Sequence, residues 1–331
     1  MNILITGIHG FVGSNLVKAL KAKHTIYGLD ITTQYKAGVE ITFLWNEFYE
    51  IPDVDVVIHL AGKAHDTKNQ TEAQVYFDIN TGLTQKIYDW FLESKARKFI
   101  FFSSVKAAAD KVVGEFLTEE VTPTPVGPYG ESKIAAEEYL MTPRPLKEDP
   151  DAVPLFNTEH ETRNTKPKTQ NTYILRPCMI HGPGNKGNLN LLYNVVKKGI
   201  PYPLGAFENR RSFCSIDNLS FVIAGLIEKN IPSGIYNVAD DESLSTNELI
   251  SILAETTHKP NRIWKWNKFV IQLVAKMGTH LRLPLNTERL HKLTENYVVS
   301  NAKLKNALGI EKMPVSAKEG FVKTIKSFDN K

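Results

Sequence analysis

The chain has 331 residues, of which 42% are hydrophobic and 23% charged, and this composition excludes disordered, fibrous and small disulfide-stapled proteins. Lysine and arginine total 40 against 36 for aspartate and glutamate, and a net charge of +4 on this length does not favour nucleic acid as a partner. Because the two cysteines lack CxxC spacing and no apolar run reaches about 18 residues, we expect a cytoplasmic protein with no metal site and no stable membrane insertion.

Apolar segments with the length of strands alternate with helical patterns between residues 2 and 238. The expected strands are Asn2–Thr6, Thr25–Asp30, Val54–Leu60, Lys98–Ser103, Thr172–Leu175 and Gly234–Val238. Such alternation is typical of βαβ units, in which consecutive strands run parallel and helices cover both faces of the sheet. The sequence therefore predicts an α/β fold built on a doubly wound parallel sheet.

The second half of the chain is less regular. Residues 141–171 are rich in proline and charge and show no periodicity, so we expect an exposed excursion between a helix and a strand. Further helices are expected near Thr246–Thr256 and Trp266–Met277. We expect residues 1–181 to form the sheet domain and residues 182–331 to form mainly a smaller substrate-binding lobe, with 212–240 returning to the sheet.

One segment, Arg262–Leu283, mixes large apolar side chains with basic ones. The apolar set is Trp264, Trp266, Phe269, Leu273 and Met277, and the basic set is Lys265, Lys268, Lys276 and Arg282. The pattern fits a helix that lies in a membrane interface. It also fits a lobe helix whose apolar face packs inward while its lysines are solvated, and we favour this second interpretation because such helices are common in soluble proteins.

Three glycines, Gly7, Gly10 and Gly13, lie between the first expected strand and the first expected helix. Glycine at such a turn lets the backbone pass close to a pyrophosphate, and the amides at the helix start point at the anion. Asp30 ends the second strand, where a carboxylate can bind a ribose diol and repels a 2′-phosphate. A tight turn with an unrelated aspartate is the alternative. The combination favours a Rossmann-type site for NAD over NADP, and His9 is interpreted as a tolerated variable position.

Tyr129 and Lys133 are four residues apart in an expected helix and therefore share a face. A nearby ammonium favours the phenolate, so we expect a lowered tyrosine pKa and a base useful near neutrality. Ser104 follows the strand Lys98–Ser103 and reaches the sheet edge where ligands bind. Ser104, Tyr129 and Lys133 together suit hydride transfer at a carbinol. His59 is expected to pack in its strand rather than to act chemically.

These motifs resemble, in their order along the chain, the extended short-chain dehydrogenase/reductase family and its nucleotide-sugar epimerase/dehydratase branch. The matching segments are GIHGFVG at 7–13, VIHLAGKAH at 57–65, FFSSVK at 101–106, PYGESK at 128–133, RPCMIHGPG at 176–184 and RRSFCSIDNL at 210–219. The resemblance spans nearly the whole chain. It implies an NAD-binding Rossmann domain in residues 1–181, a UDP-sugar substrate, and a homodimer formed through helices near Thr71–Glu93 and Tyr129–Leu140.

The resemblance also implies roles for individual residues. Ser104 matches the catalytic hydroxyl, Tyr129 the base, and Lys133 the residue that also holds the nicotinamide ribose. The expected cofactor-binding residues are Gly7, Gly10, Phe11, Val12, Gly13, Asp30, Leu60, Ala61, Gly62, Tyr129 and Lys133. Arg211 resembles the arginine that contacts the substrate diphosphate, where a guanidinium fork suits phosphate. Further substrate contacts are expected from Ser104, Lys106, Asn188 and Leu204.

Positions at which this sequence differs from the epimerase/dehydratase branch reduce the number of reactions that it could catalyse. The 4,6-dehydratases carry an Asp-Glu pair after the catalytic hydroxyl, and this chain has Val105 and Lys106 there, which disfavours dehydration. A pyrophosphate-contacting asparagine of many relatives is replaced by Met179, so Asn188 and Arg211 are the expected substitutes. Lys106 has two interpretations, a contact of the substrate phosphate or a solvated loop lysine.

The leading hypothesis is an NAD-dependent UDP-sugar 4-epimerase that acts on a UDP-hexose or UDP-N-acetylhexosamine through a transient 4-keto sugar, in the synthesis of cell-surface polysaccharide precursors. The alternative is an NAD(P)H-dependent 4-reductase of a UDP-4-keto-6-deoxy-N-acetylhexosamine, which needs only the second half of the same chemistry. A non-catalytic nucleotide-sensing protein on the same fold is the third hypothesis. It is the least favoured because both Tyr129 and Lys133 are present.

Overall fold

The computed structural model describes residues 1–64, 72–142, 170–185, 188–280 and 286–328. Seven parallel strands form its central sheet, in the order β3-β2-β1-β4-β5-β6-β9. Their bounds are β1 Asn2–Thr6, β2 Thr25–Asp30, β3 Thr42–Leu44, β4 Val56–His59, β5 Lys98–Phe102, β6 Asn171–Pro177 and β9 Gly234–Val238. The predicted α/β fold with a doubly wound parallel sheet is confirmed, and all six expected strands are present.

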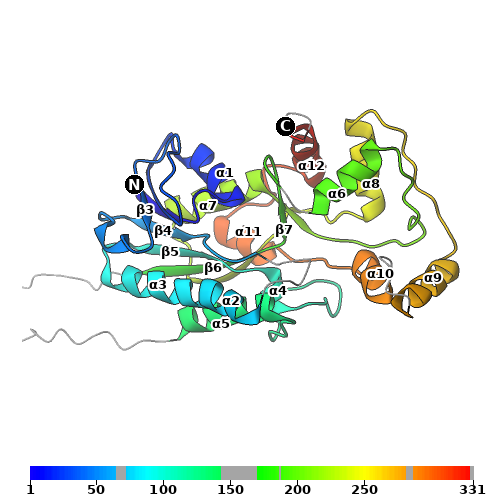
Figure 1. The fold of residues 1–331 in the computed structure, drawn as a ribbon. Helices are drawn as coiled ribbons and strands as arrows, with labels where there is room; N and C mark the ends of the chain where they lie inside the picture. The colour runs from blue at the N-terminus through cyan, green and yellow to red at the C-terminus, as the bar shows by residue number, and fades with distance from the viewer. Residues whose placement is uncertain (65–71, 143–169, 186–187, 281–285, 329–331) are drawn as a thin grey trace, which may run out of the picture.

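Helices cover both faces of this sheet (Figure 1). One face carries α1 Phe11–Leu20, α7 Ile216–Glu228 and α11 Ala302–Leu308, and the other carries α2 Ala73–Tyr76, α3 Leu83–Glu93 and α5 Pro128–Met141, with a π-helical stretch over 77–82 between α2 and α3. Side chains of β1 alternate between the two layers, since Ile3 and Ile5 pack with α1 and α7 whereas Leu4 packs with α3. Burial on both faces explains why the strands are continuously apolar.

The strand order reverses between β1 and β4. From β1 the chain runs outward through β2 to β3, and it then returns to place β4 on the other side of β1. In open α/β sheets, ligands bind beyond the carboxyl ends of the strands at such a switch point. The glycine loop that follows β1 and the segment 60–62 that follows β4 meet there.

A smaller group of helices lies beyond the sheet (Figure 1). It consists of α6 Asn188–Lys197, α8 Thr246–Thr256 and α12 Ala317–Lys326, which share one apolar cluster. Next to it a two-stranded parallel sheet pairs β7 Met179–His181 with β8 Phe213–Ser215. The α8 bounds agree with the prediction, whereas β3, β7 and β8 were not expected. The expected excursion falls mostly on residues 143–169, which lie outside the described residues.

The predicted helix near Trp266–Met277 is α9 Lys268–His280, followed by α10 Thr287–Thr294. We expected its apolar face to pack inward, and for most of that face this expectation is wrong. Ile271 and Ala275 are buried, but the large apolar side chains on the rest of the helix are exposed. No helix in the described part of the chain has the length and apolar character needed to cross a bilayer.

Candidate active site

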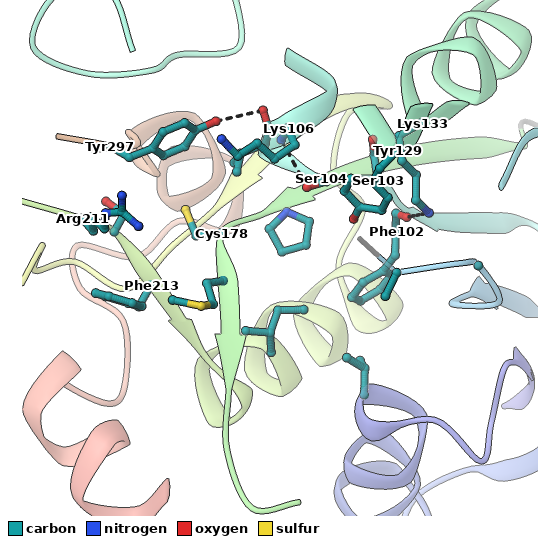
Figure 2. Close-up of a pocket in the computed structure, with 18 of the residues that line it drawn as sticks. Phe102, Ser103, Ser104, Lys106, Tyr129, Lys133, Cys178, Arg211, Phe213 and Tyr297 are labelled. Carbon is teal, nitrogen blue, oxygen red and sulfur yellow. Dashed lines mark hydrogen bonds between the residues drawn. The ribbon is translucent and has the colours of Figure 1, made fainter. Parts of the chain in front are cut away.

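A cavity of about 560 Å³ opens at the carboxyl ends of the central strands (Figure 2). It brings together Ser104, Tyr129 and Lys133, the three residues predicted to do chemistry. Val12, Leu60 and Gly62 line it from the switch point, and Lys106 and Arg211 line it elsewhere. Segments separated by more than a hundred residues therefore form one site.

The glycine loop between β1 and α1 is closely packed. Gly7 has φ +66°, and a Cβ there would lie 2.9 Å from the backbone nitrogen of Ala61. A Cβ on Gly13 would lie 2.7 Å from the carbonyl oxygens of Gly7 and Ile8. Helix α1 begins at Phe11 after Gly10, which places no side-chain cap on the first-turn amides. The loop therefore fits an anionic group such as a pyrophosphate at the helix N-terminus.

Asp30 lies at the end of β2 beside this loop, and its carboxylate is already held in place. It accepts hydrogen bonds from the backbone amides of His9 at 2.9 Å and Ile31 at 2.7 Å. The Nδ1 atom of the His9 ring lies 3.2 Å from Asp30 Oδ2, and its Nε2 donates to the Gln34 carbonyl oxygen at 2.8 Å. His9 is thus not merely a tolerated residue of the loop, as we had interpreted it. The fixed carboxylate and the glycine loop fit the adenosine half of NAD.

His59 packs inside β4, as expected, and it connects the two loops of the switch point. Thr6 Oγ1 accepts from the backbone amides of Leu60 and Ala61 and lies 2.7 Å from His59 Nδ1, so its own proton goes to that nitrogen. His59 Nε2 then donates to Thr84 Oγ1 at 3.0 Å. Burial lowers the His59 pKa to about 3, which keeps the ring neutral in this arrangement.

Ser104 and Tyr129 meet at the centre of the cavity. Ser104 follows β5 as the N-cap of the one-turn helix α4, Val105–Ala108, and accepts from the Lys106 amide at 3.2 Å. Tyr129 is the second residue of α5, which begins at Pro128 after Gly127 with φ +81°. A side-chain hydrogen bond joins Ser104 to Tyr129. The predicted serine–tyrosine pair is therefore assembled from β5 and α5.

The expected lowering of the Tyr129 pKa is wrong. Burial raises this pKa, and the Ser104 hydrogen bond offsets the effect only in part. Lys133 directs its Nζ to the carbonyl oxygen of Phe102 at 2.8 Å instead of to the phenol. Burial lowers the Lys133 pKa to about 8, against an opposing effect of Glu137. An ammonium one turn away on the helix is thus not enough to ionise a buried tyrosine.

A buried ion pair that the sequence analysis missed fixes α5 against β5 and β6. Arg176 Nη2 donates to Glu137 Oε2 at 2.6 Å, and both side chains are almost fully buried. Ser103 also donates to the Glu137 carboxylate. Lys133 is one helical turn before Glu137, so this cluster sets where the lysine can reach.

Arg211 closes the other end of the cavity. Its backbone pairs with Leu244 in both directions, and its guanidinium lies 3.7 Å from the Glu295 carboxylate. Lys106 donates to Asp110 at 2.9 Å, and its ammonium lies 4.6 Å from the centre of the Tyr297 ring. Glu295 and Tyr297 also line the cavity and were not predicted. No local motif marks either residue.

Two other predicted contact residues are not among the described lining residues of this cavity. Phe11 lies beside the loop at Gly182–Gly184. Leu204 is buried in a separate apolar cluster with Ile271 and Leu290. Asn188 is the first residue of α6, and its side chain lies outside the described part, so its predicted contact stays a prediction.

The sequence profile of the NAD dependent epimerase/dehydratase family matches residues 3–239, which include all of the central sheet except Asn2 and contain Ser104, Tyr129 and Lys133. The chain belongs to this family. It is accordingly an NAD-dependent enzyme of the epimerase/dehydratase group, and the glycine loop with Asp30 is the part of the chain that fits the cofactor.

Individual relatives agree with the family. The chain is 29% identical to a UDP-glucose 4-epimerase of Vibrio cholerae, over 99% of this chain and 95% of that protein. It is 26% identical, over 78% of this chain and 73% of the relative, to the N-acetyl-alpha-D-glucosaminyl-diphospho-ditrans,octacis-undecaprenol 4-epimerase of Escherichia coli O157:H7. Among solved structures, the UDP-glucuronic acid 4-epimerase of Bacillus cereus in complex with NAD has the same fold, with a TM-score of 0.69 and 20% identity over 100% of this chain and 99% of that one.

Proposed function

We propose that this chain is an NAD-dependent 4-epimerase of a UDP-hexose or UDP-N-acetylhexosamine, which acts through a transient 4-keto sugar and supplies precursors of cell-surface polysaccharide. The observation that carries the proposal is the hydrogen-bonded pair of Ser104 and Tyr129, with Lys133 in the same cavity wall. The similarity to proteins named as 4-epimerases of nucleotide sugars supports it.

The residues that would hold the cofactor lie along the switch point. The loop amides from Gly7 to Gly13 suit the pyrophosphate, Asp30 suits the adenosine ribose, and Lys133 suits the nicotinamide ribose. When bound, NAD supplies the hydride acceptor and donor for carbon 4 and, in its oxidised form, a positive charge that opposes the effect of burial on the Tyr129 pKa.

Tyr129 is the proposed acid and base. During oxidation its phenolate oxygen takes the proton of the 4-hydroxyl. During reduction it returns a proton to the 4-keto oxygen, after the sugar has turned so that carbon 4 receives hydride on its opposite face. Ser104 donates a hydrogen bond to the same sugar oxygen and stabilises the partial negative charge that develops there. Lys133, with a pKa of about 8, is mostly protonated at neutral pH and stabilises the phenolate.

Arg211 is the proposed contact for the substrate diphosphate, because a guanidinium can donate two parallel hydrogen bonds to phosphate oxygens. The Glu295 carboxylate lies 3.7 Å from this guanidinium and balances its charge. Lys106 lines the same cavity and carries a second positive charge toward the substrate.

The lining of the cavity argues against dehydration. Among its described lining residues, Glu295 is the only carboxylic acid, and it faces Arg211 rather than Ser104. Val105, which follows Ser104, is apolar and buried. Removing water across carbons 5 and 6 of a hexose requires an acid and a base beside the catalytic hydroxyl, whereas Val105 can act as neither and Lys106 donates to Asp110.

Epimerisation is favoured over a one-way 4-keto reduction by the opposite wall of the cavity. Cys178, Met179 and Phe213 line it with apolar groups. These three side chains offer no strong hydrogen-bond donor or acceptor that would fix the sugar hydroxyls in a single orientation. A keto sugar held mainly through its diphosphate can therefore turn and present its other face.

Mass spectrometry of small molecules released from the purified protein, together with turnover assays, tests the proposal. We expect NAD to be released, and we expect interconversion of UDP-glucose or UDP-N-acetylglucosamine with its 4-epimer without added reductant. Stoichiometric consumption of NADH or NADPH with a UDP-4-keto-6-deoxy sugar, without epimerisation, would instead identify a 4-reductase. Binding of nucleotide without any turnover would identify a sensing protein.

A further inference from the structure

A surface formed by α9 and the residues just before it exposes large apolar side chains. Phe269, Leu273 and Met277 are 72%, 50% and 54% exposed and follow one another at four-residue intervals, so they form one stripe along the helix. Trp264 and Trp266 precede the stripe, with nearly parallel rings 6.2 Å apart and about half of each exposed. We call these five residues the α9 surface.

The side of α9 opposite the α9 surface packs on the rest of the protein. Ile271 and Ala275 pack on Leu204 and Leu290 in a small cluster of their own. Ahead of the helix, the backbone of Trp264 donates to Tyr202 at 2.8 Å. Figure 1 shows α9 with α10 at one end of the molecule, away from the central sheet. The helix has therefore already used one apolar face for packing, and the second is presented outward.

The stretch of chain that carries this surface has charges of a single sign. Residues 256–287 contain no aspartate or glutamate. The basic residues of this stretch are Lys259, Arg262, Lys265, Lys268, Lys276 and Arg282. Lys265, Lys268 and Lys276 are exposed. Lys276 borders the stripe one position before Met277, whereas the Lys268 ammonium lies 5.8 Å from the centre of the Phe207 ring on the packed side of the helix. An apolar stripe bordered by lysines, with tryptophans at one end, is the pattern that lies in the boundary between lipid headgroups and acyl chains.

We propose that the α9 surface docks on a membrane rich in anionic lipids, with the stripe in the headgroup boundary and the lysines on the phosphates. A second copy of the chain suits it less, because two copies would bring the exposed Lys265, Lys268 and Lys276 of one against the same lysines of the other. The surface is linked to the active-site cavity, since α10 packs on α9 and leads directly to Glu295, the partner of Arg211. Docking would thus hold the Arg211 end of the cavity near the bilayer. This inference does not depend on the proposed reaction.

Co-sedimentation with vesicles tests the proposal. The probes are vesicles of equal parts phosphatidylethanolamine and phosphatidylglycerol, and vesicles of phosphatidylcholine alone. We expect the wild-type protein to sediment with the anionic vesicles. The double variant Phe269→Ser/Leu273→Ser should bind these vesicles at least roughly tenfold more weakly than the wild type. Each change of Lys265, Lys268 or Lys276 to Gln should weaken binding about fivefold, and so should a rise in salt.

Matched control variants alter exposed apolar residues elsewhere. Leu191 on α6 is 66% exposed and Phe116 is 48% exposed, so Leu191→Ser and Phe116→Ser should leave vesicle binding unchanged. All variants should unfold cooperatively and keep wild-type turnover of a soluble UDP-sugar, which separates this test from that of the reaction. Wild-type protein that stays in the supernatant, or a double variant that sediments equally, overturns the proposal. So does light scattering that shows a wild-type oligomer dissociating in the double variant, since the surface would then be a protein interface.

Discussion

Lys133 donates to the carbonyl oxygen of Phe102 at 2.8 Å from within the wall of the active-site cavity, where only 5% of its surface is exposed. This position lowers the pKa of the ammonium from 10.5 to about 8. At neutral pH the charged lysine therefore destabilises the fold. The cost is fully present below pH 8 and is relieved as the pH rises toward 10.5, because the unfolded chain binds more protons in that range.

Replacing Lys133 by Met should separate stability from activity. The difference in the free energy of unfolding, wild type minus Lys133→Met, should rise by about 3 kcal/mol between pH 7 and pH 10.5. It rises because the native wild type no longer holds a buried charge at the higher pH. Turnover should be lost in the variant at every pH. Denaturant titrations at both pH values measure the difference, and a difference that does not change with pH would show that the buried ammonium has an ordinary pKa.

Tyr129→Phe removes the phenol oxygen and keeps the ring, whose centre lies 6.2 Å from the centre of the Tyr76 ring. Turnover should fall about 10²- to 10⁴-fold, which is the usual contribution of an acid–base group. Release of NAD from the denatured variant should match the wild type. Steady-state assays and cofactor quantification check both statements, and wild-type turnover in the variant would exclude Tyr129 as the acid and base.

The His59 ring makes the fold sensitive to acid. Its pKa is about 3 in the folded protein against 6.5 in the unfolded chain, so the unfolded chain takes up a proton first as the pH falls below 6.5. Between pH 7.5 and pH 5, the wild type should lose about 2 kcal/mol more stability than His59→Gln, which has no titrating ring. Urea titrations at both pH values test this, and equal losses would mean that His59 is protonated in place.

Arg211→Met should raise the KM for the UDP-sugar roughly 10- to 100-fold, because a charge-assisted contact to the diphosphate is lost. The retained NAD should not change. Arg210 is the matched control, since its side chain is 57% exposed and pairs with Glu248 outside the cavity. Arg210→Met should change KM by no more than about threefold. Equal effects of the two substitutions would count against a specific role for Arg211.

Much of the fold could be predicted because the strands of a buried parallel sheet are continuous apolar runs. The glycines and Asp30 mark the switch point by local spacing alone. Strands β3, β7 and β8 have only three residues each, which is too short for a local pattern to distinguish them from loops. The α9 periodicity indicated an apolar face, but only the position of Leu204 and Leu290 decides which residues are covered.

The candidate site could be predicted where the chemistry lies in short motifs, as for Ser104, Tyr129 and Lys133. It could not be predicted where a residue acts through a distant partner. Glu295 meets Arg211 from 84 positions away, and Arg176 meets Glu137 from 39 positions away. The prediction of a lowered Tyr129 pKa was wrong for a related reason. The spacing showed the neighbouring ammonium, whereas burial, which has the larger effect, depends on the folded cavity.

The most direct test of the proposed 4-epimerase uses a UDP-hexose that carries deuterium at carbon 4, followed by NMR in the presence of excess unlabelled NADH. A 4-epimerase removes this hydrogen and returns the same one to the opposite face while the keto sugar stays bound. We expect that the 4-epimer forms and keeps its deuterium at carbon 4, and that the Tyr129→Phe variant forms almost none. Formation of an epimer with hydrogen at carbon 4, or no epimer with any UDP-hexose or UDP-N-acetylhexosamine, would contradict it.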